Sequence, residues 1–206
     1  ETSVQKKLGI EDSNEQFFQD TMKGGKQLNN PDLVRTLTQK SAETVDWLIA
    51  QGMDLSDVGI TGGSTNKRSH RPAGGAPVGS HFVSVMLKAV EKAGIDIRYN
   101  TKVTAILSKD GKAAGVTVTE GDKTYNINAK AVIIATGGFG ANNDLVVSYK
   151  PDLKGFGTTN FPGATGDALA WIKPFNVALV DMDQIQTHPT VVPVKNIMIT
   201  EAVRGN

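Results

Sequence analysis

A run of five apolar residues that leads directly into two glycines constrains the fold more than any other feature of the sequence. Residues 131–135 read Ala-Val-Ile-Ile-Ala, and Thr136-Gly137-Gly138 follow them. A short segment that is apolar at every position is typical of a strand in a parallel sheet, where both faces are buried. The sequence therefore predicts a buried parallel strand, followed by a loop whose backbone can approach a ligand closely.

Further short strands are expected before this run. Alternating apolar residues predict them over residues 95–99, 103–107, 116–118 and 125–127. Asp110-Gly111 and Gly121-Asp122 separate the last three segments, and such dipeptides are typical of tight hairpin turns. We therefore expect an antiparallel β-meander, in which Val103 is a core residue by its position in the pattern.

Helices are predicted mainly on the N-terminal side of these strands. They are expected around residues 14–22, from Pro31 to Gly52, and from a capping Ser80 to Gly94, with a short one over 168–172 that Gly166-Asp167 introduces. Residues 53–79 are rich in Gly, Ser, Thr, Asn and Pro, which predicts a long irregular loop. Loops of that length are usually functional or mobile.

The order of these elements indicates the class of fold. Helices, a strand, a meander, a buried strand and a glycine pair are typical of an α/β (α+β) dinucleotide-binding fold that carries an antiparallel β-meander as an insertion. Such a fold begins with a strand, a Gly-x-Gly-x-x-Gly turn and a helix that holds the pyrophosphate. The sequence contains no such turn and starts at Glu1 rather than Met. We therefore expect an internal segment whose fold is incomplete at its N-terminus.

Composition and charge exclude several classes of function. Lys and Arg number 22 against 21 for Asp and Glu, so the formal charge of +1 gives no basis for binding nucleic acid or an anionic membrane. The absence of cysteine excludes disulfides, thiolate catalysis, iron–sulfur clusters and Cys-ligated zinc. No apolar stretch approaches the roughly 20 residues that span a bilayer. The compartment, whether cytoplasmic or in the cell envelope, stays open.

Two glycine-containing turns are candidate ligand-binding segments. Thr136-Gly137-Gly138 can direct free backbone amides at a nucleotide, or it can be an ordinary tight turn after a strand. Thr165-Gly166-Asp167 precedes a short helix. Asp167 can therefore hydrogen-bond a ligand or cap that helix, and the local pattern favours the cap.

Among the three histidines, His188 is the candidate for chemistry. A polar turn bounded by Pro189 holds it between two apolar runs. The alternative is a structural histidine whose ring bonds to the backbone, which is the commoner role. His70 and His81 flank the glycine-rich loop without metal-ligand spacing, and we interpret them as loop residues rather than zinc ligands.

Polar residues follow the apolar run Ile197-Met198-Ile199 near the end of the chain. Thr200 and Glu201 come directly after it, and Arg204 lies three residues beyond Glu201. Glu201 and Arg204 can form an ordinary surface ion pair, which contributes little. They can also form a buried carboxylate–guanidinium relay, and the apolar run before them favours this second interpretation.

Six motifs, taken together and in this order, resemble those of the soluble fumarate reductases of the flavocytochrome c type, within the succinate dehydrogenase and fumarate reductase family. They are Thr21-Met-Lys-Gly-Gly25, His70-Arg-Pro-Ala-Gly-Gly75, Ala135-Thr-Gly-Gly-Phe139, Pro162-Gly-Ala-Thr-Gly-Asp167, Gln186-Thr-His-Pro-Thr190 and Ile199-Thr-Glu-Ala-Val-Arg-Gly-Asn206. The resemblance extends over the whole chain. Related reductases of other unsaturated acids share most of these motifs.

The resemblance implies a cofactor, a substrate and a set of site residues. It implies FAD as the cofactor, with hydride delivered from the flavin N5 to fumarate, and succinate as the product. The cofactor-binding residues it implies are Val103, Ala135, Thr136, Gly137 and Asp167. It assigns His188 and Thr200 to the substrate carboxylates, and Glu201 and Arg204 to the relay that reprotonates a catalytic arginine.

The resemblance also implies how the chain divides. Residues 1–187 are expected to be the interior of an FAD-binding domain, and residues 188–206 the beginning of a capping domain over the substrate. The proton-donating arginine is expected beyond Asn206, as is an electron-donor domain or protein outside the segment. We therefore expect the segment alone to be inactive.

Two alternatives remain at this point. One is a reductase of another α,β-unsaturated carboxylate, such as urocanate or methacrylate, or a dehydrogenase that runs in the opposite direction. The other is a non-catalytic module that retains the fold. The candidate relay of Glu201 and Arg204 argues against this second alternative, because a binding module needs no proton relay.

Overall fold

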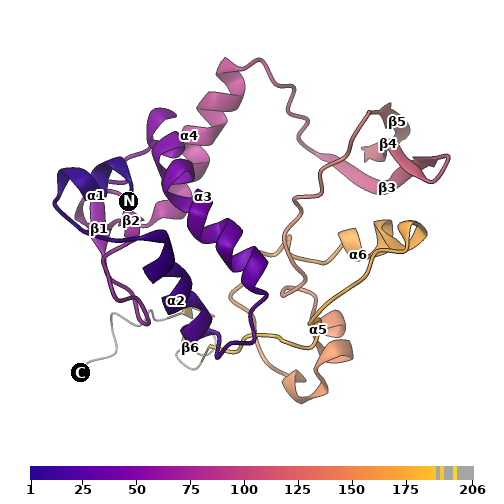
Figure 1. Cartoon of the computed structure of the whole chain (residues 1–206). Helices are drawn as coiled ribbons and strands as arrows, with labels where there is room; N and C mark the ends of the chain where they lie inside the picture. The colour runs from indigo at the N-terminus through magenta and orange to yellow at the C-terminus, as the bar shows by residue number, and fades with distance from the viewer. Residues whose placement is uncertain (189–190, 193–196, 199–206) are drawn as a thin grey trace. The chain divides into compact units, whose positions relative to one another are not determined.

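The computed structural model describes residues 1–188, 191–192 and 197–198, and the chain divides into two units, Glu1–Ile97 and Arg98–Asn206 (Figure 1). The predicted boundary between an FAD-binding domain (residues 1–187) and a capping domain (residues 188–206) is a different division of the chain, and it stays a prediction.

Two capped helices of the first unit pack against each other. In α2 (Asn14–Gly24) the Ser13 hydroxyl accepts a hydrogen bond from the backbone N–H of Gln16, and in α3 (Pro31–Ala50) the Asn30 side chain accepts from two backbone amides of the first turn. Phe18, Met22 and Val34 form a small buried cluster between these helices. Burial of such side chains contributes about 1.5–3 kcal/mol each, and both predicted helices are confirmed.

The predicted irregular loop 53–79 contains more structure than its composition indicates. Strand β1 (Asp57–Gly59) pairs antiparallel with β2 (Ser69–Arg71), and a 3-10 turn, η1 (Ala73–Gly75), follows. Each strand has three residues, which is too short for an alternating pattern to be visible in the sequence. The short helix α1 (Ser3–Lys7), capped by Thr2, also belongs to this unit.

Helix α4 (Val78–Lys92) begins earlier than predicted. Its N-cap is Pro77, which makes no side-chain hydrogen bond, so the expected cap at Ser80 is wrong. The proline ring fixes φ, and Pro77 (φ −59°, ψ 129°) has the non-helical backbone of a residue that precedes a helix, so α4 begins at Val78. The predicted end is confirmed, because Gly94 has a φ of 66°, in the left-handed region that favours glycine.

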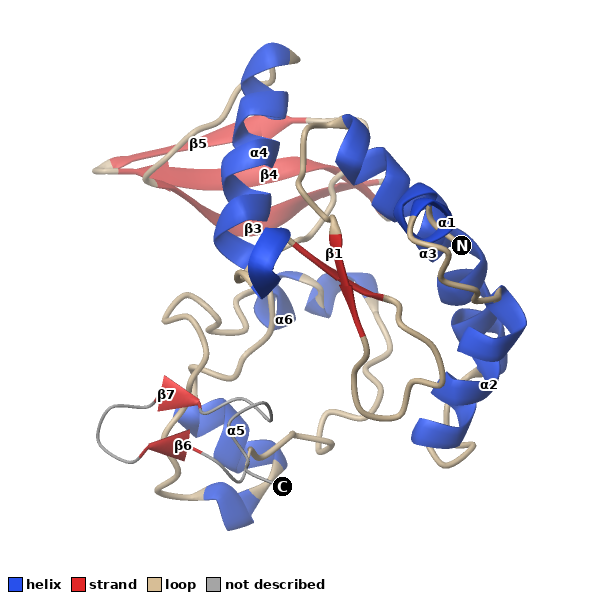
Figure 2. Cartoon of the chain, turned by 90° about the vertical axis from the view of Figure 1, so that its left-hand side faces the viewer, coloured by secondary structure: helices blue, strands red, loops and turns tan. Residues whose placement is uncertain are grey.

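The second unit contains the predicted meander. Strands β3 (Thr101–Lys109), β4 (Lys112–Glu120) and β5 (Lys123–Asn128) form an antiparallel sheet in the order β3-β4-β5, and Figure 2 shows the three strands side by side. Asp110 and Gly111 have φ values of 52° and 74°, which a tight hairpin turn requires. Val118 is almost fully buried and pairs with the half-buried Val103, so the sheet has an apolar core.

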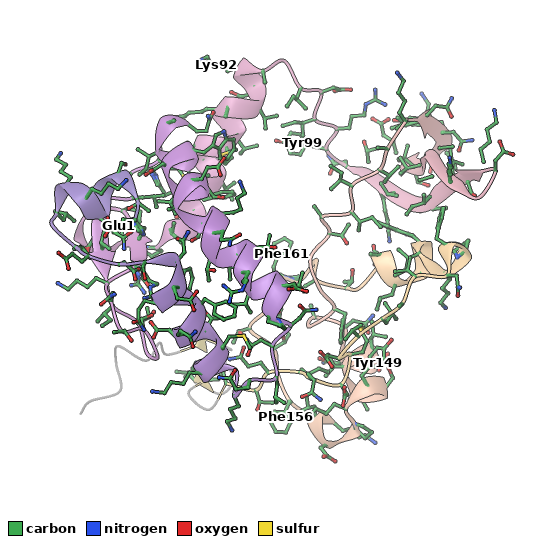
Figure 3. The ribbon with its side chains drawn as sticks, viewed as in Figure 1. Glu1, Lys92, Tyr99, Tyr149, Phe156 and Phe161 are labelled. Atoms are coloured by element: carbon green, nitrogen blue, oxygen red, sulfur yellow. The ribbon has the colours of Figure 1, made fainter. Side chains whose placement is uncertain are left out.

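Two predicted strands are absent from the structure. Residues 95–99 and 131–135 have no strand hydrogen bonding, and their side chains include Tyr99 (Figure 3) and Ile133, which are 69% and 92% exposed. A strand requires a neighbour for its backbone groups, and among the described residues no strand pairs with either segment. The described strand pairs are all antiparallel, so the parallel strand predicted over 131–135 is not formed in this chain.

Short elements complete the second unit. They are α5 (Asn143–Tyr149), η2 (Pro151–Leu153), α6 (Ala168–Trp171), η3 (Lys173–Phe175), β6 (Val191–Val192) and β7 (Ile197–Met198). The predicted short helix after Gly166-Asp167 is therefore confirmed as α6. Within the part of the chain that the structure describes, no helix has the length and apolar character needed to cross a membrane.

Candidate functional site

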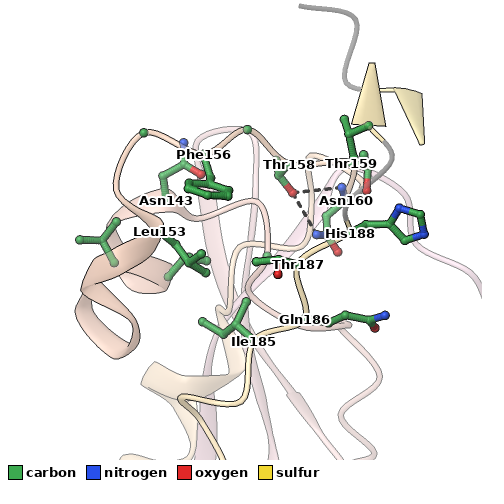
Figure 4. A pocket seen from close by; sticks show the side chains of 16 residues that line it. Asn143, Leu153, Phe156, Thr158, Thr159, Asn160, Ile185, Gln186, Thr187 and His188 are labelled. Carbon is green, nitrogen blue, oxygen red and sulfur yellow. Dashed lines mark hydrogen bonds between the residues drawn. The ribbon is translucent and has the colours of Figure 1, made fainter. Parts of the chain in front are cut away.

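Two adjoining cavities in the second unit contain the candidate histidine. Their volumes are about 520 Å³ and about 390 Å³, and the residues they share include Gly140, Thr159, Asn160, Gln186 and His188. Figure 4 shows the side chains that line the larger cavity, with the His188 ring at its outer edge. The smaller cavity is also lined by Gly138, which belongs to the candidate glycine turn. The structure therefore brings Gly138 and His188 to one hollow, whereas the predicted cofactor residues Gly137 and Asp167 line neither cavity.

Hydrogen bonds hold the two candidate glycine turns side by side. The backbone N–H of Gly166 donates to the carbonyl oxygen of Gly138 (3.1 Å), and the N–H of Ala141 donates to the carbonyl oxygen of Ala164 (2.9 Å). The side-chain amide of Asn142, the N-cap of α5, donates to the carbonyl oxygen of Thr165 (3.0 Å). These contacts join the segment after Thr136 to the segment that carries Asp167.

Gly166 must be glycine for this arrangement. Its φ is 77°, and a Cβ there would lie 2.8 Å from both Leu145 Cδ2 and Phe139 Cβ. Phe139 in turn packs against Tyr149 of α5, with ring centroids 5.5 Å apart. The turn at Gly166 is thus packed between Phe139 and Leu145 of α5.

Gly137 supplies the open backbone that a flat ligand requires. Its φ is 74°, and a Cβ built on it meets no atom within 4 Å. Ala135 and Thr136 are exposed beside it. A left-handed glycine with free space in front of it lets a nucleotide approach the backbone, so these residues fit the role that the sequence predicts for them.

Asp167 does not cap α6, so the local interpretation as a helix cap is wrong. Its backbone is already helical (φ −51°, ψ −37°), and its side chain makes no capping hydrogen bond. Instead, the Thr165 hydroxyl donates to Asp167 Oδ1 (2.8 Å), and Lys102 Nζ lies 3.9 Å from Asp167 Oδ2. A carboxylate held in this way beside a glycine turn can accept hydrogen bonds from ribose hydroxyls.

The contact between Lys102 and Asp167 also brings the segment of Val103, a third predicted cofactor residue, close to Asp167. Lys102 is the residue before Val103 in β3, so β3 lies against the start of α6. Val103, Gly137 and Asp167 therefore come from neighbouring segments of one unit. Thr200, Glu201 and Arg204 lie outside the described residues, and their predicted roles stay predictions.

The other two histidines have structural partners in the first unit. His70 Nδ1–H donates to the carbonyl oxygen of Arg68 (2.9 Å), and a 2.9 Å hydrogen bond joins His70 Nε2 to the Thr2 hydroxyl. His81 Nε2 accepts from the backbone N–H of Asp54 (2.9 Å). The interpretation of both as loop residues is wrong, because His70 lies in β2 and His81 lies in α4.

Sequence reasoning missed a buried ion cluster around Arg68. Its guanidinium forms a two-point hydrogen bond with Asp12, at 2.9 Å for each pair of atoms, and lies 2.6 Å from Asp20 Oδ2. The three side chains are at most 10% exposed. No local pattern in the sequence could have revealed this cluster, because its members are so far apart along the chain.

The ion cluster shifts the pKa values of its members. Burial alone would raise the pKa of Asp12 and of Asp20, but hydrogen bonds outweigh it and lower both. The donors are Arg68 and Asn66 for Asp12, and Thr65, Arg68 and Gln16 for Asp20. Burial has the opposite effect on Arg68 and would lower its pKa. The hydrogen bonds and charges of the two carboxylates outweigh burial, so the pKa of Arg68 is raised. All three groups are therefore held in their charged forms.

Comparison with known proteins decides which family this arrangement represents. Residues 2–206 match the family described as FAD binding domain. The chain belongs to this family. It is 48% identical over its whole length to the fumarate reductase (cytochrome) of Shewanella frigidimarina and 40% identical to the NADH:fumarate oxidoreductase of Klebsiella pneumoniae, of which it covers 36% and 22%.

Solved structures support the same conclusion for this FAD-binding domain. The open conformation of a flavocytochrome c3 fumarate reductase matches 99% of the chain, and 36% of that protein, with a TM-score of 0.93 and 37% identity. The predicted α/β (α+β) fold with an antiparallel meander and the predicted resemblance are thus confirmed, and FAD is the cofactor. The chain spans about a third of the length of the fumarate reductase it matches at 48% identity.

Proposed function

We propose that the full-length protein uses FAD to reduce fumarate to succinate. The observation that carries this proposal is that one cavity is lined both by Gly138, of the glycine turn predicted to bind FAD, and by His188, predicted to bind the substrate carboxylate. The 48% identity to a fumarate reductase over the whole chain supports the choice of substrate.

In this proposal, residues of the present chain bind FAD. Gly137 presents open backbone to the flavin nucleotide, with Ala135 and Thr136 beside it. Asp167, oriented by the Thr165 hydroxyl, accepts hydrogen bonds from the nucleotide. Val103, in β3, packs against the nucleotide. When bound, FAD supplies hydride to one carbon of the substrate double bond.

Side chains bind the substrate and supply the proton in this proposal. His188 and Thr200 bind the carboxylates of the substrate and polarise the double bond. Glu201 and Arg204 pass a proton to an arginine outside this chain, and that proton completes the second C–H bond of succinate. We further propose that residues 188–206 begin the domain that covers the substrate, and that an electron-donor domain or protein reduces the flavin.

The experiment that tests this function uses the flavin as its reporter. In the full-length protein, the visible flavin absorbance should be bleached by dithionite and restored by fumarate. The His188→Ala variant should retain the flavin spectrum but lose about 1.5–3 kcal/mol of substrate binding, which is a rise in KM of roughly ten-fold to a hundred-fold. His81→Ala is the control, because His81 belongs to the first unit, where its Nε2 accepts a hydrogen bond from the backbone N–H of Asp54.

Two outcomes would overturn the proposal. Reoxidation by urocanate but not by fumarate would move the protein to another substrate, and a urocanate reductase of Eggerthella lenta is 33% identical over 90% of the chain. Flavin that no unsaturated acid reoxidises would indicate a module that retains the fold without the activity.

A further inference from the structure

Asn160 is held at the cavity by its neighbour Thr158. The Thr158 hydroxyl oxygen accepts two hydrogen bonds from Asn160, one from the backbone N–H (3.1 Å) and one from the side-chain Nδ2 (2.9 Å), as Figure 4 shows. Both residues line the larger cavity. An exposed asparagine normally samples several side-chain orientations, and these two bonds restrict it to one.

Gly140 makes room for this amide. A Cβ on Gly140 would lie 2.4 Å from Asn160 Nδ2 and 2.7 Å from Asn160 Cγ, distances that require a shift of the side chain. The φ of Gly140 is outside the left-handed region, so its backbone angle does not require glycine. Close approach of the Asn160 side chain is therefore the structural reason for glycine at this position.

The fixed amide has a second donor, and Asn160 lines the same two cavities as His188. A side-chain amide carries two N–H groups, and Thr158 uses one of them. Asn160 and His188 line both adjoining cavities. Ionised carboxylates accept hydrogen bonds and have no donor, so a dicarboxylate in this space needs N–H and O–H groups around it.

We propose that Asn160 binds a carboxylate of the dicarboxylate substrate through Nδ2, and that Thr158 and Gly140 position its amide. This inference rests on the proposed function and adds a substrate-binding residue to it. Thr158 acts through its hydroxyl oxygen, and Gly140 acts through the absence of a Cβ.

The test combines kinetics with direct binding in the full-length protein. Asn160→Ala should raise the KM for fumarate at least ten-fold, with a smaller change in kcat, because a hydrogen bond to a charged group is lost. Asn160→Asp should bind more weakly still, because it sets a carboxylate against a carboxylate. Titration calorimetry with succinate should show the same order of affinities without turnover.

Matched pairs separate positioning from damage to the fold. Thr158→Ser keeps the hydroxyl and should retain the KM, whereas Thr158→Val should raise it about as much as Asn160→Ala. Gly140→Ala should weaken succinate binding, whereas Gly79→Ala, where an added Cβ meets no atom within 4 Å, should not.

The two levels of the proposal fail in different ways. If the wild type reduces fumarate and both Asn160→Ala and Thr158→Val keep its KM and succinate affinity, Asn160 is not a substrate residue. If the wild type does not reduce fumarate, the proposed function is wrong. Calorimetry with succinate then decides whether Asn160 binds a dicarboxylate. Equal succinate affinities of the wild type and Asn160→Ala overturn the role of Asn160.

Discussion

At the scale of single residues, the ion cluster around Arg68 is the main polar anchor of the first unit. It ties segment 60–68 to α2 through Asp20 and to the segment before α2 through Asp12. The Arg68 guanidinium also lies 4.8 Å from the centroid of the Phe17 ring. Removing one member of such a cluster leaves the others charged and buried, which costs more than the loss of the hydrogen bonds.

Replacement of Arg68 should therefore destabilise the protein strongly. Arg68→Met should lower the free energy of unfolding by about 3 kcal/mol, because Asp12 and Asp20 lose their partner in a largely buried place. Urea denaturation followed by circular dichroism measures this change. Lys40→Met is the control, because the ion pair of Lys40 with Glu43 is mostly exposed and should contribute less than about 1 kcal/mol. Equal effects of the two substitutions would contradict the assignment.

At the scale of elements, the meander depends on one close backbone approach between strands. Gly115 in β4 has a φ of 145°, and a Cβ there would lie 2.1 Å from the carbonyl oxygen of Ile127 in β5. Both the backbone angle and the space in front of it therefore require glycine. The register of β4 against β5 is compatible only with that residue.

A methyl group at this position should disrupt the sheet. Gly115→Ala should lower the free energy of unfolding by about 2 kcal/mol or more, since it combines backbone strain with a steric clash. Gly59→Ala, also in a strand but with no atom within 4 Å of the added Cβ, should change it by less than about 0.5 kcal/mol. Differential scanning calorimetry distinguishes the two, and a Gly115→Ala variant with the wild-type Tm would exclude the clash.

At the scale of the whole molecule, the lowered carboxylate pKa values make stability depend on pH. Asp12 and Asp20 have pKa values in the folded protein below their ordinary value of 3.8. The folded state therefore favours their charged forms, and its stability from these groups is fully present above the unfolded pKa. It is lost as pH falls below about 4 toward the folded pKa values.

The Asp20→Asn variant should reveal this dependence. The difference in unfolding free energy between wild type and variant should be largest near neutral pH and should shrink below about pH 4, as the wild-type carboxylate becomes protonated. Urea denaturation across this pH range measures it. Asp122→Asn, in an exposed turn, should give a small difference at every pH. A wild-type advantage over Asp20→Asn that grew on acidification would have the wrong sign.

Local chemistry determined the parts of the fold that the sequence predicts correctly. Ser13, Asn30 and Pro31 begin helices because side-chain oxygens and a fixed φ satisfy a helix start without help from distant residues. Asp110-Gly111 forms a hairpin for the same kind of reason. The glycine turn at 137 could be recognised as a candidate site because it follows an apolar run, and the turn at 166 because it precedes an acidic residue and a short helix.

Tertiary structure alone decided the rest. The apolar segment 131–135 has the composition of a buried strand, but a strand forms only where a neighbour satisfies its backbone groups, and Ile133 remains exposed. The joining of Arg68 to Asp12 and Asp20, and of Gly140 to Asn160, links residues between 20 and 56 positions apart. Contacts at such separations have no periodicity or local motif, because they depend on where the chain returns in space.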